Sequence, residues 1–122
     1  MSEDRQEQPA ASMTERMRQD LKVAMRERDQ VRVRALRTAM GAIANAEAPP
    51  VDTDPRKVTD EPDVGVLVEH RRLELSDHDL DAILRAEIAD RLDTAEQFES
   101  HDRADEAATV RAEAAVIETY CR

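Results

Sequence analysis

The residues best suited to acid–base or metal chemistry are carboxylates spaced largely three apart in the second half of the chain. They are Asp79, Glu87, Asp90, Asp93, Glu96 and Glu99. On one helix such groups could bind a cation or act as paired acid and base. Carboxylate metal centres in helical bundles, however, also use a Glu-x-x-His motif on neighbouring helices, and this sequence has none. We therefore interpret the acidic run as a solvated helix face.

Histidine and cysteine offer the remaining candidates for metal binding or nucleophilic catalysis. The chain has three histidines, His70, His78 and His101, and a single cysteine, Cys121. A zinc site needs several such ligands at one place, and no spacing here supplies them. Cys121 has no evident His partner to activate it. We predict no catalytic residue, no metal and no cofactor.

Composition and cysteine usage also indicate where the protein works. One cysteine cannot form an internal disulfide and is compatible with a reducing cytosol. No apolar run approaches the roughly 20 residues that span a bilayer. The first twelve residues are polar and acidic and lack the apolar stretch of a secretion signal. We expect a cytoplasmic protein that makes no use of a membrane, with residues 1–12 as a disordered leader.

The basic side chains concentrate in one segment of an acidic protein. Residues 16–37 hold eight basic and three acidic side chains, whereas the net charge of the whole chain is −10. Such a patch can steer a nucleic acid or another anionic partner, or it can neutralise acidic helices of the same molecule. Our candidate contact residues are Lys22, Arg26, Arg28, Arg34, Arg37 and Asn45.

Gly41 lies on the same helix face as part of this basic segment. Glycine in a helix costs about 1 kcal/mol relative to alanine. Its presence indicates either the close approach of another helix or contact with the backbone of a ligand. Packing against another helix is the more common explanation.

The composition favours an all-α fold. Phe98 and Tyr120 are the only aromatic residues, and only two glycines are present. A core of Leu, Ile, Val, Met and Ala suits closely packed helices, whereas a β-sandwich needs aromatic faces and many turn glycines.

Apolar spacing and capping residues place two helices in the first half of the chain. Ser12 followed by Glu15 matches a capping box, which predicts a helix from about Ser12 to Arg28. Asp29 then interrupts the apolar pattern and is a good N-cap. It predicts a second helix over residues 30–46. So short a break makes either a hairpin or one bent helix, and we favour the hairpin.

Prolines and acids mark a long connection before the second half. Pro49 and Pro50 end the second helix, and residues 48–63 hold four prolines and many acids. Residues 64–75 could form a short strand, but no partner strand is evident. We interpret them as an extended segment lying on the helices, so that residues 48–75 form one loop or insert.

Two further helices follow this connection. Ser76 and Asp79 form a cap-and-acid pattern at the start of a third helix. Its apolar stripe breaks at His101, and Asp102 is the expected N-cap of a fourth helix. The prediction is a four-helix arrangement of two helical hairpins, joined by a long loop rich in proline and acids.

Two segments of the sequence, residues 20–47 and 98–120, resemble the GatB/YqeY family. In the first, the matching residues are Asp20-Leu21-Lys22, Ala24-Met25, Arg28-Asp29, Leu36-Arg37, Ile43, Asn45 and Glu47. In the second, they are Phe98, Arg103, Asp105, Ala107, Ala112-Glu113, Val116-Ile117-Glu118 and Tyr120. The segment between about Pro49 and Arg72 is longer than in compact members of that family.

The resemblance implies a single YqeY-like helical domain over residues 13–122. In the related tRNA-dependent amidotransferase the catalytic steps belong to other domains or subunits, and the helical region helps to hold tRNA. The family-level label, carbon–nitrogen ligase activity with glutamine as amido-N-donor, comes from that complex. Stand-alone members usually continue into a small helical tail domain. This chain stops at Arg122, so we expect that domain to be absent.

We therefore expect a non-catalytic helical module that contacts tRNA, or components of the amidotransferase or translation machinery, through the basic hairpin. The alternative is a protein–protein interaction module that binds no RNA.

Overall fold

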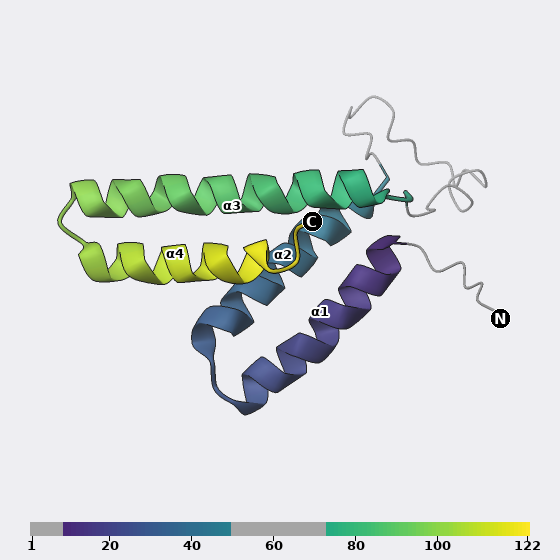
Figure 1. The fold of residues 1–122 in the computed structure, drawn as a ribbon, viewed down its shortest axis with the longest axis horizontal. Coiled ribbons are helices and arrows are strands. Elements are labelled where there is room, and N and C mark those ends of the chain that lie inside the picture. Colours follow the sequence, from purple (N-terminus) through teal and green to yellow (C-terminus); the bar gives the residue numbers. More distant parts are fainter. Residues whose placement is uncertain (1–8, 50–72) are drawn as a thin grey trace, which may run out of the picture.

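The computed structural model describes residues 9–49 and 73–122, which form four α-helices and no β-strand. These are α1 (Pro9–Arg26), α2 (Gln30–Glu47), α3 (Asp77–Ser100) and α4 (Ala104–Glu118). Helices α1 and α2 form one hairpin, and α3 and α4 form the other (Figure 1). The predicted all-α class and the pair of hairpins are confirmed.

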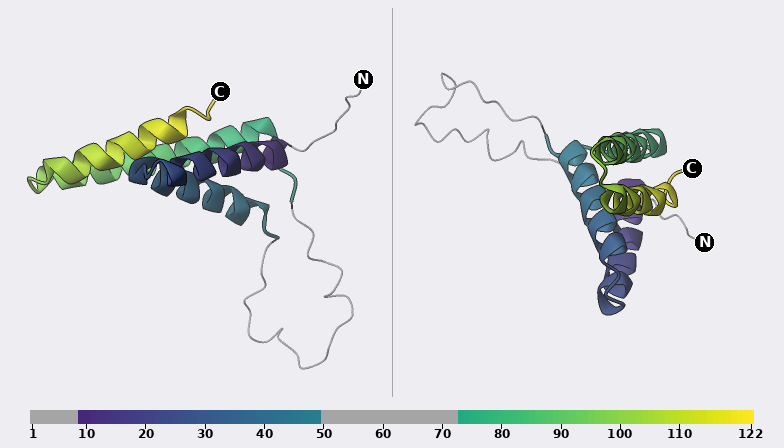
Figure 2. Two further views of the ribbon diagram at one scale, coloured as in Figure 1. Left: turned by 90° about the horizontal axis from the view of Figure 1, so that it is seen from below. Right: turned by 90° about the vertical axis from the view of Figure 1, so that its left-hand side faces the viewer.

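The two hairpins cross rather than stacking in parallel. Helices α3 and α4 lie side by side along their length, and α2 packs across both of them. Helix α1 packs mainly on α2 (Figure 2). The turn between α1 and α2 therefore extends away from α3 and α4 (Figure 1). The turn between α3 and α4 lies at the end of that hairpin that is distant from α1 (Figure 1).

The start of α1 differs from the sequence prediction. The helix begins at Pro9, so Ser12 lies within it and does not cap it, and residues 9–12 are not part of a leader. Proline suits the first turn of a helix because its missing N–H would have no partner there. Glu15 binds its neighbours Arg18 and Gln19, each at 2.7 Å. Residues 1–8 of the predicted leader lie outside the described part of the chain.

The predicted boundary between α1 and α2 is confirmed in position. Asp29 is the N-cap of α2, and its carboxylate accepts a hydrogen bond from the backbone N–H of Arg32 at 3.2 Å. Helix α1 ends at Arg26, two residues earlier than predicted, because Arg28 has a φ of 57° and reverses the chain. Helix α2 continues one residue beyond the prediction, to Glu47.

The start of α3 is confirmed in detail. The hydroxyl of Ser76 accepts from the backbone N–H of Asp79 at 3.0 Å, and the carboxylate of Asp79 accepts from the backbone N–H of Ser76 at 3.0 Å. This reciprocal pair is a complete capping box.

The start of α4 is a correction. Arg103, not Asp102, occupies the N-cap position, and no side chain caps this helix. Asp102 has a φ of 60° and forms the turn instead. A very short connection between antiparallel helices needs a left-handed residue, which aspartate tolerates better than most.

The long connection is described only at its two ends. Residues 48–49 and 73–76 form neither helix nor strand. The backbone N–H of Leu73 donates to the carbonyl of Glu47 at 2.7 Å, so these ends lie together. Leu75 is buried in the core. The predictions for residues 50–72, the possible strand included, fall outside the described residues.

Aliphatic side chains from all four helices form the core. The largest fully buried side chains are Met17, Leu36, Ile43, Leu84 and Ile117. Buried alanines on each helix allow the helices to approach closely. Two large apolar side chains of these helices lie outside the core, since Met25 is 50% and Leu92 46% exposed. Among the described helices, none is long and apolar enough to cross a bilayer.

Candidate functional site

Three of the predicted contact residues lie at the free end of the α1–α2 hairpin. Lys22 and Arg26 are one turn apart on α1, and Arg28 is in the turn that follows. All three are exposed. Within residues 9–49 and 73–122 they form no salt bridge or hydrogen bond through their side chains. The hairpin end thus presents three cations that intramolecular contacts do not neutralise.

Arg37 and Asn45 lie farther along α2, and both are exposed. Arg37 is one turn before Gly41, and Asn45 is one turn after it, so the three share a side of the helix. The Arg37 guanidinium has no anionic partner in the described parts of the chain. It adds a fourth uncompensated cation to the hairpin.

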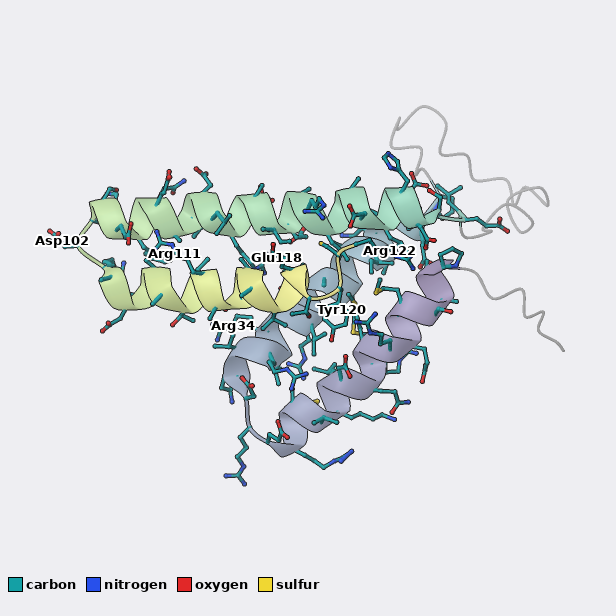
Figure 3. All side chains as sticks on the ribbon, in the orientation of Figure 1. Arg34, Asp102, Arg111, Glu118, Tyr120 and Arg122 are labelled. Atoms are coloured by element: carbon teal, nitrogen blue, oxygen red, sulfur yellow. The ribbon has the colours of Figure 1, made fainter. Side chains whose placement is uncertain are left out.

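Arg34 is different, because it is held by the acidic hairpin. Its Nη1 lies 3.4 Å from Oε2 of Glu113 on α4, and Figure 3 shows Arg34 beside that helix. The Glu113 side chain is only 6% exposed, and its Oε1 lies 3.3 Å from Nε of Arg91 on α3. Arg91 also pairs with Glu87 at 3.0 Å. This charged cluster joins α2, α3 and α4.

The spacing of residues on α4 did not predict that Glu113 would lie at the centre of a buried charge cluster. Its place in the sequence could have indicated its burial. Glu113 directly precedes Ala114, and both residues lie on the buried side of α4. One of our two interpretations of the basic segment was that it neutralises acidic helices of the same molecule. The contact of Arg34 with Glu113 does this at one point. Lys22, Arg26, Arg28 and Arg37 have no such partner among the described residues, so this neutralisation does not account for them.

The other basic residues of the hairpin have local partners. Arg18 pairs with Glu15 at 2.7 Å, and Arg32 lies 3.9 Å from Glu27. The guanidinium of Arg16 stacks 4.7 Å from the centre of the Tyr120 ring. These three arginines therefore contribute less free charge to the surface than the four unpaired cations.

Tyr120 joins the end of α4 to α1. Its hydroxyl donates to Oδ2 of Asp20 at 2.5 Å, and the residue is 5% exposed. Burial, followed by the hydrogen bond to the Asp20 carboxylate, raises the pKa of Tyr120 to about 12. The phenol therefore stays neutral at physiological pH and acts as a structural latch between the hairpins.

Two carboxylates of the acidic run, Asp79 and Glu99, and the thiol of Cys121 have pKa shifts opposite to those that activate catalytic groups. Arg111 lies 2.8 Å from Glu99 and lowers the pKa of that carboxyl through a hydrogen bond. Hydrogen bonds from Ser76 similarly lower the pKa of Asp79. Both shifts favour ionised, solvated acids over proton donors. Burial raises the pKa of the Cys121 thiol, which disfavours the nucleophilic thiolate.

Candidate metal ligands do not converge in the described residues. No group of three or more His, Cys, Asp or Glu side chains there is placed to hold a metal ion. His101 uses its Nδ1 in a contact of 2.8 Å with the backbone carbonyl of Gln97. The candidate site that remains is the surface of the α1–α2 hairpin.

Comparison with protein families identifies the second half of the chain. Residues 66–121 match the family model of the Yqey-like proteins. This part of the chain is similar to Yqey-like proteins. The resemblance inferred from Phe98 to Tyr120 is thereby confirmed, and the match supports a small helical module of GatB/YqeY type. A search of curated proteins found no match.

The Yqey-like match includes the whole of α3 and α4, with Glu113 and Tyr120. Residues 20–47, where we also noted a resemblance, lie outside it. The unpaired cations therefore lie on helices that the match does not cover. These helices contact the matched region through two side-chain pairs. Arg34 pairs with Glu113, and Asp20 accepts a hydrogen bond from Tyr120.

Proposed function

We propose that this chain is a non-catalytic helical module that contacts tRNA through the α1–α2 hairpin. The observation that carries the proposal is a set of four exposed, unpaired cations in the described residues. They are Lys22, Arg26, Arg28 and Arg37. Phosphate groups take such side chains as counterions, and the release of bound salt supplies most of the affinity. Asn45 can add a hydrogen bond to a sugar or base.

In this proposal the carbon–nitrogen ligase activity associated with the family belongs to separate catalytic partners. The chain would serve those amidotransferase components, or the translation machinery, in the cytoplasm. The raised pKa of the Cys121 thiol and the lowered pKa of Glu99 support a role in contact rather than in amide transfer. Incubation with glutamine, ATP and mischarged tRNA tests this role. Release of ammonia or ADP above background would contradict it.

A salt titration tests the RNA contact directly. Purified protein is titrated with total tRNA at two or more ionic strengths. Four phosphate contacts should give a slope of about −3 to −4 in log K against log salt. Undetectable binding at low salt would count decisively against the proposal.

Single neutralising substitutions locate the contact. Arg26→Gln and Arg37→Gln should each reduce the magnitude of the salt slope by about 1. Arg111→Gln is the matched control, because it removes the same charge from α4, where Arg111 pairs with Glu99. Arg34 is a poor test residue, since its removal also disturbs Glu113. Equal effects from Arg26→Gln and Arg111→Gln would indicate a general charge effect and no defined contact.

A protein partner at the same hairpin is the second candidate. The net charge of −10 repels RNA at long range. In addition, Met25 is 50% exposed and lies with Lys22 and Arg26 at a depression of about 360 Å³. An exposed apolar residue framed by cations suits an acidic protein surface. A partner that is retained after nuclease treatment and lost with Met25→Asp would favour this candidate.

A further inference from the structure

A groove runs between α1 and α2 that no described residue fills. Its volume is about 540 Å³, and it is lined by Ala11, Thr14, Arg18, Met40, Gly41, Ala44 and Glu47. Gly41 lies in the middle of α2, yet a Cβ built on it would meet no atom within 4 Å. Packing among the described residues therefore does not explain this glycine, which is a poor helix former. Of the two explanations that the sequence offered for Gly41, the close approach of another helix is not seen among the described helices.

The exposed side of α3 carries a protruding apolar side chain of the kind that could fill such a groove. Leu92 is 46% exposed, with Ala89 one turn before it and Glu96 one turn after it on that side of the helix. The carboxylate of Glu96 forms no salt bridge within residues 9–49 and 73–122. Leu92 is therefore an exposed apolar side chain that is not part of the core, with Ala89 and Glu96 beside it on the helix.

Charge at one end of the groove matches this side of α3. Arg37 lies one turn before Gly41 on α2, and Lys22 lies one turn after Arg18, which lines the groove on α1. Neither Arg37 nor Lys22 has an ionic partner among the described residues. Arg37 and Lys22 flank the end of the groove nearer the α1–α2 turn, whereas Glu47 lines the other end. An occupant with an acid beside an apolar knob would therefore satisfy both the shape and the charge of the end near the turn.

We propose that the occupant is α3 of a second copy of this chain, with Leu92 seated over Gly41 and Glu96 facing Arg37. The two patches lie on different hairpins of each molecule, so each copy carries both a groove and a knob. Reciprocal use of both patches gives a closed dimer, whereas one-sided use gives open chains. Lys22 and Arg37 also belong to the proposed tRNA contact, so tRNA and a second copy would compete for them, and the self-association is tested in the absence of RNA.

Sedimentation equilibrium of nuclease-treated protein tests the proposal. At low salt the weight-average mass should rise above 13.8 kDa with concentration, and it should fall back as salt screens the ion pairs. A mass that stays at 13.8 kDa up to millimolar protein would overturn the proposal.

Two substitutions test the knob and the groove separately. Gly41→Leu fills the groove from an open position and adds a better helix former, so the monomer should keep its thermal stability while association falls at least tenfold. Leu92→Ser should weaken association to a similar extent. Val23→Ser is the control, because Val23 is also apolar and exposed but does not line the groove. Association that survives both Gly41→Leu and Leu92→Ser would refute the assignment of the surfaces.

A charge exchange tests the pairing across the contact. Arg37→Glu and Glu96→Arg should each weaken association, because each places like charges together. The double variant restores opposite charges and should recover most of the affinity. Failure of the double variant to recover more than either single variant would exclude the proposed register of α3 in the groove.

Discussion

The guanidinium of Arg34 on α2 lies 3.4 Å from the carboxylate of Glu113 on α4, and the two side chains differ sharply in burial. Arg34 is 63% exposed, whereas Glu113 is 6% exposed. Water can solvate Arg34 when the pair is broken, but the glutamate depends on Arg34 and Arg91 for compensation. The contact is therefore asymmetric, and the acid is the member on which the packing of three helices depends.

Removal of Glu113 should destabilise the fold much more than removal of Arg34. Glu113→Ala leaves Arg91, whose side chain is 14% exposed, with Glu87 as its remaining partner. Breaking a buried ion pair from one side typically costs about 3–5 kcal/mol, and the remaining partner should reduce this to about 2–3 kcal/mol. Arg34→Ala should cost about 1 kcal/mol or less. Urea unfolding followed by circular dichroism measures both free energies of unfolding.

The control for this comparison is Glu99→Ala. It breaks the pair between Glu99 and Arg111, in which both side chains are about half exposed, and it should change the free energy of unfolding little. If Glu113→Ala were as mild as Glu99→Ala, the cluster would not stabilise the crossing of the hairpins.

The hydrogen bond from Tyr120 to Asp20 should make stability depend on pH in the alkaline range. The pKa of Tyr120 is about 12 in the folded protein and about 10 in an unfolded chain. Between these values the folded state holds a proton that the unfolded state has lost, so stability falls as pH rises. The stabilisation is fully present below pH 10 and is lost as the pH passes through about 12. Thermal unfolding between pH 8 and 12 measures this loss.

Tyr120→Phe supplies the matched variant for this pH dependence. It keeps the ring that Arg16 stacks on and removes the titrating group, so the alkaline loss of stability attributable to Tyr120 should disappear. At pH 7 the variant should lose about 1 kcal/mol through the missing hydrogen bond. Because the chain has one tyrosine and no tryptophan, absorbance near the tyrosinate band gives the pKa directly. A measured pKa near 10 in the folded protein would contradict the latch.

The capping box at the start of α3 should contribute measurably to stability. Ser76→Ala removes the hydroxyl that accepts from the backbone N–H of Asp79, and loss of such a cap costs about 1 kcal/mol. Ser76→Thr retains a hydroxyl and should keep most of the stability. A denaturant midpoint for Ser76→Ala equal to that of the unsubstituted protein would show that water replaces the cap without loss.

Local signals in the sequence were sufficient to predict the fold. Asp29 and Ser76 each begin a helix through hydrogen bonds to residues three positions away, and such short-range chemistry is visible in the sequence. The helical spacing of apolar residues then gives the faces that meet in the core. Where a local signal was ambiguous the prediction failed, as at Ser12, where Pro9 starts the helix earlier.

The candidate site was less accessible from sequence because it depends on partners far apart in the chain. Arg34 and Arg37 cannot be distinguished in the sequence, since both are arginines of the same helix. The crossing of α2 over α4 places only Arg34 beside a buried carboxylate. Likewise, the sequence gives no indication that the space around Gly41 is open. Which cations remain free is decided by the packing of one hairpin on the other, and spacing within one helix does not determine it.

The backbone of Asp102 makes the turn between α3 and α4 a sensitive test of this fold. With a φ of 60°, any residue other than glycine is strained there, and β-branched residues are strained most. Asp102→Val should therefore cost about 1–2 kcal/mol, whereas Asp102→Gly should be neutral or stabilising. Asp90→Val, at an exposed position within α3, is the control for the general effect of valine and should cost less than about 1 kcal/mol.

The substitution Asp102→Ser distinguishes a left-handed turn from an N-cap at this position, because an N-cap favours serine over glycine and a left-handed turn favours glycine over serine. If thermal unfolding ranked Asp102→Ser above Asp102→Gly, the residue would act as a cap after all.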